Sequence, residues 1–229
     1  MPMVLLENVK NLASAHVEVL SMIVTKLESF GYRVWWKVLN ALDYGVPQNR
    51  ERIFIVAVLK EYGNADFADF KWPEPMPRVK ITSILDPLTE DERTAGSKLN
   101  NRKPPATQTV ARANLKRGLD ELKSCGVVDP SKVAVVMDID SSKLHMMYDK
   151  SPCLTCSRAR SGGYWVSSRG RRFTMAEMLR LQGVEMNLQQ PDTVTDNQFG
   201  QIVGNGIPVP MLSCLLSELL QFRSWTATT

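Results

Sequence analysis

The sequence predicts an α/β fold in which a sheet domain is followed by a small irregular domain. Residues 4–6 and 53–59 are apolar and residues 33–39 are of strand-forming types, and a helical pattern separates the first two segments. Between residues 73 and 105, six prolines exclude long helices. The chain has 229 residues, of which 44% are apolar, and this is enough to bury a core in each part.

The first sixty residues alternate between strand and helix. The spacing of apolar residues predicts a helix over residues 17–27, and Gly31 marks its end. A tight turn around residues 45–47 predicts that the strands on either side of it form an antiparallel pair. The second of these strands is rich in Ile and Val, which is typical of a buried strand.

Residues 61–150 predict an irregular small domain or an inserted lobe, because no sustained periodicity accompanies the prolines. Acidic and basic residues occupy different segments of this stretch. Residues 86–92 are acidic, whereas residues 98–117 hold six basic residues and no acidic one. We expect neither a long helix nor an internal repeat here.

Residues 151–183 have a marked charge imbalance, with no lysine and one acidic residue, Glu177. Their basic residues are all arginines: Arg158, Arg160, Arg169, Arg171, Arg172 and Arg180. Because arginine contacts both phosphates and base edges, this stretch favours a polyanionic partner over a plain solvated helix. Thr174 and Glu177 match a capping box that predicts a helix ending at Gly183, and an amphipathic helix is predicted over 208–222.

Composition excludes several classes of protein. Charged residues at 23% do not indicate disorder, and a net charge of +4 is too small to identify a nucleic-acid binder by itself. The longest continuous apolar run, 53–59, is shorter than the about 20 residues of a membrane helix, so no membrane association is expected. Four scattered cysteines do not resemble a secreted disulfide framework, which favours an intracellular protein. Cys153 and Cys156 form only half of a zinc site, so no metal is expected.

Two clusters of polar residues accompany the strands of the first domain. Glu7 and Asn8 follow the first strand, at the end where open α/β sheets place their ligands. Arg50 and Arg52 stand at alternate positions before strand 53–59, so both can grip one anion or planar polar group. Each cluster, taken alone, is also typical of a solvated strand end.

Residues 204–206, Gly-Asn-Gly, precede the predicted last helix. The N-terminus of a helix is a place where backbone donors meet a carboxylate. The pattern alone is weak evidence, because many turns share it.

The order of these motifs is more specific than any one of them. The sequence contains Glu-Asn-Val, then Gln-x-Arg-x-Arg before a strand, then Arg-x-x-Thr-x-x-Glu-x-x-Arg-Leu-Gln-Gly, then Gly-Asn-x-x-Pro before the final helix. In this order they resemble the cytosine-5 DNA methyltransferase family. The resemblance covers residues 1–60 and about 151–222. The middle segment lies where that family keeps its variable target-recognition domain.

The resemblance implies part of an S-adenosylmethionine-dependent methyltransferase sheet domain, Rossmann-like in fold, with a small irregular target-recognition domain. Residues 1–60 would be the C-terminal half of the catalytic sheet. Residues 61–183 would be the target-recognition domain, variable over 61–150 and arginine-rich over 151–183. Residues 184–229 would be a return segment whose C-terminal helix packs on the catalytic domain.

The reaction of the family gives roles to the residues of the first domain. A cysteine thiolate adds to carbon 6 of a flipped-out cytosine, so that carbon 5 takes the methyl group of S-adenosylmethionine. By resemblance, Glu7 hydrogen-bonds ring nitrogen 3 and the exocyclic amine, and Asn8 orders the loop around it. Arg52, with Arg50 beside it, binds the base carbonyl oxygen and braces the catalytic loop, and Gln48 supports that strand.

The resemblance also assigns residues of the later segments. Asn205 and Gly206 would touch the methionine end of the cofactor. The residues that would organise the structure around the site are Gln48, Glu177, Arg180, Gln182, Gly183 and Gly204. Those that would bind double-stranded DNA are Arg158, Arg160, Arg169, Arg171 and Arg172.

Two motifs of the family are missing from this sequence. They are the Phe-x-Gly-x-Gly turn that cradles the cofactor and the Pro-Cys-Gln loop that carries the nucleophile before Glu-Asn-Val. Pro152-Cys153 comes too late in the order and fits the Pro-x-Leu-Thr stretch of the family, so Cys153 is not assigned as the nucleophile. We therefore expect the C-terminal part of a methyltransferase, inactive alone and completed by an N-terminal segment or a complementary polypeptide.

Two other functions stay open at this point. One is a catalytically inactive DNA-binding or regulatory module. The other is methylation of cytosine in RNA by the same fold. The expected location is the nucleus in a eukaryote and the cytoplasm in a bacterium.

Overall fold

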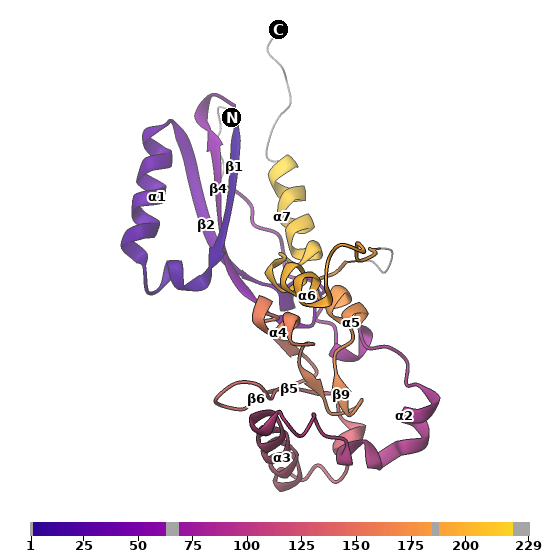
Figure 1. Ribbon diagram of the computed structural model, residues 1–229. Coiled ribbons are helices and arrows are strands. Elements are labelled where there is room, and N and C mark those ends of the chain that lie inside the picture. The colour runs from indigo at the N-terminus through magenta and orange to yellow at the C-terminus, as the bar shows by residue number, and fades with distance from the viewer. Residues whose placement is uncertain (1, 63–68, 185–187, 222–229) are drawn as a thin grey trace.

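The computed structural model describes residues 2–62, 69–184 and 188–221. Figure 1 shows one sheet between helices α1 and α7 and, at the other end of the molecule, a smaller sheet beside α3. The strands are β1 (Met3–Val9), β2 (Tyr32–Asn40), β3 (Gln48–Asn49), β4 (Glu51–Leu59), β5 (Val135–Asp138), β6 (His145–Tyr148), β7 (Ser151–Pro152), β8 (Trp165–Val166) and β9 (Arg171–Arg172). The α-helices are α1 (Val17–Ser29), α2 (Glu90–Ala95), α3 (Thr109–Ser124), α4 (Cys156–Arg160), α5 (Met175–Leu181), α6 (Asp196–Asn205) and α7 (Val209–Gln221). Short 3-10 helices occupy Lys10–Ala13, Ala41–Asp43, Lys60–Tyr62, Ile81–Ser83, Gly96–Asn101 and Pro130–Lys132.

β4 is the central strand of the first sheet. It pairs antiparallel with β1 on one side and with β2 on the other. The three strands predicted for this region are confirmed, and so is the antiparallel pair formed by β2 and β4. The predicted helix is also confirmed as α1. Gly31 follows it with a φ of 86°, a conformation that favours glycine.

The alternation of side chains along β4 decides how the sheet is covered. Ile53 and Ile55 point to one face, where they pack with Leu20 of α1. Phe54 points to the other face, where it packs with Leu215 of α7. Because both faces are covered, β4 is apolar from Ile53 to Leu59, as its sequence predicted.

The second sheet has the strand order β6-β5-β8-β9, and its neighbouring strands are all antiparallel. Alternate residues of β5 face opposite sides of this sheet. Met137 packs with Leu115 of α3, whereas Val136 belongs to a cluster with Met178 of α5 and Phe199 of α6. The smaller sheet is therefore also covered on both faces.

The expectation that residues 61–150 hold no long helix is wrong at α3, which has 16 residues. Two residues on its buried face are not apolar side chains. Asn114 is buried and donates to the carbonyl oxygens of Ile139 and Ser141, at 3.0 and 2.8 Å. A Cβ on Gly118 would lie 3.0 Å from the Met137 sulfur, so this position is adapted to close packing. An asparagine and a glycine on the inner face hide the helical pattern of apolar residues.

The return segment forms a helix, α6, that we did not predict. Its N-terminus is a capping box between Thr195 and Gln198, a signal that is present in the sequence. α6 packs closely on α4. A Cβ on Gly200 would lie 2.6 Å from the Ala159 carbonyl oxygen, and one on Gly204 would lie 2.5 Å from that of Thr155. The two glycines therefore allow the helices to approach at backbone distance.

Within Asp196–Gln221 an 18-residue window has a mean hydropathy of 1.4, so the stretch meets the length and composition of a membrane-crossing helix. Our comparison of continuous apolar runs missed this stretch, because polar residues are scattered through it. Core helices pass the same test. Residues 206–208 divide the stretch into α6 and α7, and each of the two helices packs on a protein core.

Contacts cross the predicted domain boundaries at two places. Phe70 and Trp72, which follow the first boundary, pack in the core of the first sheet. α6 packs with the second sheet, whereas α7 packs with the first. β3 and β7 pair in parallel and join the two parts of the molecule. The boundaries at residues 60 and 183 stay a prediction.

Candidate functional site on β1 and β4

Glu7 and Arg52 meet on one face of the first sheet. In the antiparallel register Glu7 lies opposite Phe54, so Arg52, two residues before it, is a diagonal neighbour on the same face. The Glu7 Oε1 and Arg52 Nε atoms are 2.9 Å apart, and the side chains are 26% and 15% exposed. Arg52 also donates from Nη1 to the Glu51 carbonyl oxygen, at 2.8 Å. The pair is held by the protein yet open to a ligand.

Asn8 lies at the exposed end of β1 beside this pair. Its side-chain Oδ1 accepts a hydrogen bond from the Val9 N–H, at 2.8 Å. A side chain that bonds its neighbouring backbone fixes the local path of the chain. The geometry therefore suits a residue that orders the loop.

Arg50 is almost fully buried, with 2% exposure. Its Nη1 donates to the Leu154 and Gly204 carbonyl oxygens, at 2.9 and 3.3 Å. Burial lowers the pKa of Arg50, a shift that the nearby Cys153 opposes and Arg52 reinforces. Arg50 thus holds the start of β4 against the segment that follows β7 and against the last turn of α6, which is the arrangement of a positioning residue.

Cys153 is the residue of this site that sequence reasoning missed. Its sulfur lies 3.4 Å from Arg50 Nη1 and 3.7 Å from Arg52 Nη2. We expected Arg50 and Arg52 to grip one anion or planar polar group. They do approach one group together, but it is the thiol of Cys153. Cys153 follows β7, and the pairing of β7 with β3 brings it to the arginines across about a hundred residues of sequence. In the described part of the chain, no three His, Cys, Asp or Glu side chains gather to hold a metal ion.

Gln48 connects the first sheet to the recognition segment from a fully buried position. Its Oε1 accepts from the Leu154 N–H at 2.8 Å, and its Nε2 donates to the Leu181 carbonyl oxygen at 2.9 Å. Gln182 continues this network by donating to the Val203 carbonyl oxygen, at 2.8 Å. These amides satisfy buried backbone groups that would otherwise lose their hydrogen bonds.

Two glycines of the predicted motifs lie at close contacts beside this network. Gly183 follows α5 with a φ of 69°. A Cβ there would lie 2.2 Å from Pro210 Cδ, so the end of α5 meets the start of α7 only with glycine at this position. Gly204 lies against α4, as described above. Close packing therefore explains why both positions are glycine.

Asn205 and Gly206 form the junction between α6 and α7. Asn205 is exposed, so its amide is accessible to a ligand. The Gly206 N–H donates to the Ile202 and Val203 carbonyl oxygens, at 3.1 and 3.3 Å. The Val209 N–H donates to Gln182. The backbone N–H groups of Gly206 and Val209 are therefore used within the protein, whereas the Asn205 side chain stays exposed.

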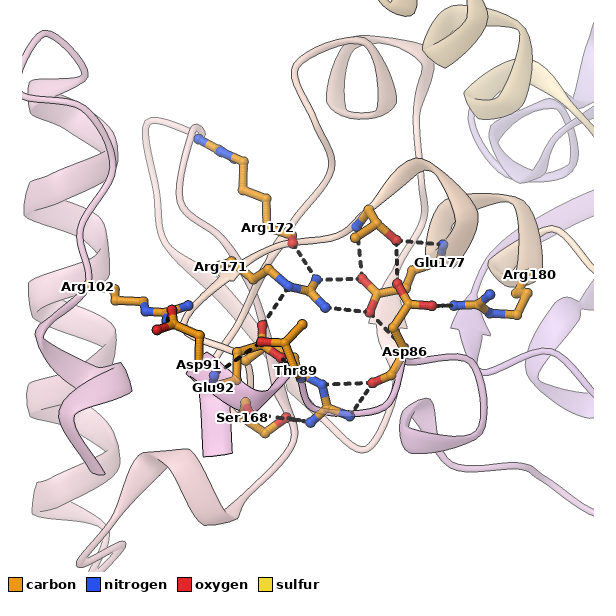
Figure 2. Close-up of polar contacts among 12 residues, drawn as sticks. Asp86, Thr89, Asp91, Glu92, Arg102, Ser168, Arg171, Arg172, Glu177 and Arg180 are labelled. Atoms are coloured by element: carbon orange, nitrogen blue, oxygen red, sulfur yellow. Dashed lines mark hydrogen bonds and ion pairs between the residues drawn. The ribbon is translucent and has the colours of Figure 1, made fainter. Parts of the chain in front are cut away.

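A network of arginines and carboxylates organises the recognition segment, and Figure 2 shows Arg171 between Glu92 and Glu177. Arg171 donates to Glu177 from Nη1 and Nη2, at 2.8 and 3.0 Å, and from Nε to Glu92, at 2.9 Å. Glu177 also accepts from the backbone N–H groups of Thr174 and Asp86. Burial alone would lower the pKa of Arg171, but the bonds to Glu177 and Glu92 raise it above its ordinary value.

Asp86 extends this network to two further arginines. Its carboxylate accepts from Arg180 and from the Thr174 hydroxyl, and its carbonyl oxygen accepts from Arg169 at 2.9 Å. Burial raises the pKa of Asp86, but the hydrogen bonds from Arg180 and Thr174 outweigh it and hold the pKa below its ordinary value. The capping box of Thr174 and Glu177 predicted for α5 is confirmed, and this network surrounds it.

Arg172 and Arg158 are paired with carboxylates as well. Arg172 donates to both oxygens of Asp140, each at 2.7 Å. Arg158 Nε and Asp138 Oδ1 are 2.9 Å apart, and Arg158 also donates to the Ser141 hydroxyl. The positive charge of residues 151–183 is therefore balanced by acidic residues of the preceding segment, which a count within 151–183 could not show.

Arg160 differs from the other arginines that we predicted to bind DNA. It is exposed at the last residue of α4 and lines a small cavity of about 260 Å³ with Gly162 and Phe173. It makes no ion pair or hydrogen bond with the residues that the structure describes. Its charge is thus available to a partner.

The described residues form an α/β protein whose first sheet carries the Glu7–Arg52 pair. The C-5 cytosine-specific DNA methylase family matches residues 2–221, and the chain belongs to this family. It is 30% identical to the Type II methyltransferase M.HaeII of Haemophilus aegyptius over 94% of this chain and 60% of the relative. It is also 30% identical to M.NgoBI of Neisseria gonorrhoeae, over 91% of this chain and 57% of the relative. The chain thus spans about 60% of the length of these curated relatives.

Solved structures show the same fold. The chain aligns with the Entamoeba histolytica methyltransferase EhMeth at a TM-score of 0.59 and 18% identity, covering 96% of this chain and 62% of the other. It aligns with the S. pombe Dnmt2 methyltransferase at a TM-score of 0.54 and 18% identity, covering 96% and 67%. The predicted family and the predicted partial methyltransferase fold are confirmed.

Proposed function

We propose that the chain supplies the target-base and DNA-recognition part of a DNA (cytosine-5-)-methyltransferase, which transfers a methyl group from S-adenosylmethionine to cytosine carbon 5 in double-stranded DNA. The observation that carries the proposal is the partly exposed Glu7–Arg52 pair at the end of β1, in a chain that belongs to the C-5 cytosine-specific DNA methylase family. We place the protein inside the cell, with its DNA: in the nucleus of a eukaryote or the cytoplasm of a bacterium.

The pair suits a planar base that carries both donors and acceptors. One Glu7 carboxyl oxygen accepts a hydrogen bond from the exocyclic amine of a flipped-out cytosine, the other shares a proton with ring nitrogen 3, and Arg52 donates to the carbonyl oxygen of the base. Arg50 and Gln48 do not touch the base. They fix β3 and β4 through buried hydrogen bonds, so that Arg52 keeps its position.

S-adenosylmethionine, when bound, supplies an electrophilic methyl group. Asn205 would hold the amino-acid end of this cofactor through its exposed amide, and Gly206 leaves the adjacent surface without a side chain. The Phe-x-Gly-x-Gly motif that cradles the cofactor in the family does not occur in this sequence. The main cofactor contacts therefore belong to another polypeptide or segment in this proposal.

The same complementary part would carry the Pro-Cys nucleophile. β1 is the place for it to join, because within the described residues β1 pairs only with β4 and its other edge is open. Leu6 and Val9 are exposed along this strand. An unpaired strand with exposed apolar side chains is a template for strand addition.

The proposal is tested with labelled S-adenosylmethionine and duplex DNA. We expect no methyl transfer by the full chain alone and transfer after addition of a polypeptide that carries the Phe-x-Gly-x-Gly and Pro-Cys-Gln motifs. Methylation by the isolated chain that persists in Cys153→Ala would contradict the need for a partner. DNA binding without methylation in any combination would instead indicate a regulatory module, and failure to bind DNA at low salt would overturn both.

A further inference from the structure

Residues of α3 line a basic groove of about 630 Å³. Figure 1 shows α3 at the end of the molecule away from β1 and β4. The floor of the groove is apolar and includes Leu115 and Leu119. Its charged lining consists of Arg102, Lys103, Arg112, Lys116, Lys123 and one acidic residue, Asp120. Five cations against one carboxylate give this groove a strong positive potential.

Part of this charge is already engaged by the protein. Arg102 pairs with Asp91 at 2.9 Å, and Lys116 pairs with Asp120 at 3.2 Å across one turn of α3. Each pair cancels one positive charge of the groove. The remaining cations of the groove make no ion pair or hydrogen bond within the described chain: Lys103, Arg112 and Lys123. These three charges are available to an external anion.

Their spacing fits an extended anion better than a single small one. Arg112 and Lys123 are eleven positions apart on α3, which corresponds to about 16 Å along the helix axis. One strand of DNA advances about 3.4 Å per phosphate, so a distance of this size spans several phosphates. Cations spread along a groove are therefore matched to a phosphodiester backbone.

We propose that the α3 groove binds the phosphate backbone of duplex DNA outside the target base pair. The inference rests on the proposed function, because it takes DNA as the substrate. It assigns the contact to Lys103, Arg112 and Lys123, whereas the predicted arginines Arg171 and Arg172 are held by carboxylates. The groove would add affinity that does not depend on base sequence.

The test is the salt dependence of binding of a fluorescent duplex to the full chain, with the triple variant Lys103→Ala, Arg112→Ala, Lys123→Ala. Because each phosphate contact adds about 0.9 to the slope of log K against log salt, the triple variant should have a slope shallower by about 2.7. The matched control removes three exposed lysines at other places, Lys26, Lys60 and Lys71. It should have the wild-type slope.

The outcomes separate this inference from the proposed function. Steep wild-type binding with an unchanged slope in the triple variant overturns the groove and leaves the proposed function standing. Absence of wild-type DNA binding at low salt overturns both. A poly-glutamate peptide is included as a probe. If wild-type protein binds it more tightly than DNA and the triple variant loses that binding, the groove is a site for an acidic protein and the inference is wrong. An unchanged melting temperature shows that the triple variant is folded.

Discussion

The Glu7–Arg52 and Arg171–Glu177 pairs join the same two chemical groups at similar distances, 2.9 and 2.8 Å, in different surroundings. Glu177 has no exposed surface and its oxygens accept from Arg171 and from two backbone N–H groups. Glu7 is 26% exposed, and one arginine is its only ion-pair partner in the described chain. A saturated buried pair holds the fold together, whereas a partly open pair can accept a ligand.

The origin of this difference lies in the elements that carry the two carboxylates. Glu177 is in the first turn of α5, where the capping box and the packing of residues 86–92 surround it. Glu7 is near the end of β1, an edge strand, where fewer neighbours compete for its oxygens. The predictions that follow test this contrast, from the largest expected effect to the smallest.

Glu177→Ala should have the largest effect on stability. The substitution leaves Arg171 without its main partner in the part of the molecule that contains the second sheet. Breaking a buried ion pair in this way costs about 3–5 kcal/mol. The free energy of unfolding from urea titration measures it. Glu121→Ala, on the exposed surface of α3, is the matched control and should stay within about 0.5 kcal/mol of wild type. A loss below about 1 kcal/mol for Glu177→Ala would show that the network does not hold this part of the molecule together.

Arg52→Ala should have a large effect on chemistry and a small one on stability. Removal of a donor to the base should lower methyl transfer by the complemented protein by about 10²-fold. The free energy of unfolding should change by less than about 1 kcal/mol, because the pair is partly exposed. Lys26→Ala removes an exposed cation of α1 and serves as control for both measurements. A wild-type transfer rate in Arg52→Ala would remove the base-binding role.

Asp86 should make the free energy of unfolding decrease as the pH falls into the acid range. Its pKa is lowered in the folded protein, so its contribution is fully present above the ordinary Asp pKa of about 3.9. That contribution is lost as the pH falls from there through the lowered pKa. Asp86→Asn should therefore lose less unfolding free energy than wild type between pH 5 and pH 3. Urea titrations at both pH values measure this, and equal losses in the two proteins would contradict it.

Arg160→Ala should have the smallest effect. As an exposed residue with no partner in the described chain, it contributes at most one phosphate contact, so the salt slope of DNA binding should become shallower by about 0.9. Stability should be unchanged. Lys26→Ala on α1 is the control. A slope identical to that of the control would show that Arg160 does not contact DNA.

The sequence was sufficient for elements whose signals are local. β1, β2 and β4 contain runs of apolar or strand-forming residues, and α5 begins with the capping box at Thr174. It was not sufficient for α3, whose inner face includes Asn114 and Gly118, or for α6, whose inner face includes Gly200. A small or polar residue on a buried face removes the periodicity from which a helix is predicted.

The site was predictable only in part for a related reason. Glu7 and Arg52 belong to neighbouring motifs of one sheet, and the structure brings them together. Glu177 is only six residues from Arg171, but other partners of the arginines are far away in sequence: Arg171 meets Glu92 across 79 residues, and Arg52 meets Cys153 across 101. Contacts of this kind depend on the tertiary fold, so the free charge of a segment cannot be read from its composition.

The most direct test of the contrast is methyl transfer by Glu7→Gln in the presence of the complementary polypeptide, normalised to the folded fraction measured in the same sample. The substitution keeps the shape of the side chain and removes its charge. We predict a folded protein whose transfer rate falls by about 10²-fold or more, while Glu18→Gln on α1 keeps the wild-type rate. A Glu7→Gln protein that transfers methyl groups at the wild-type rate, or that unfolds as Glu177→Ala does, would contradict the account.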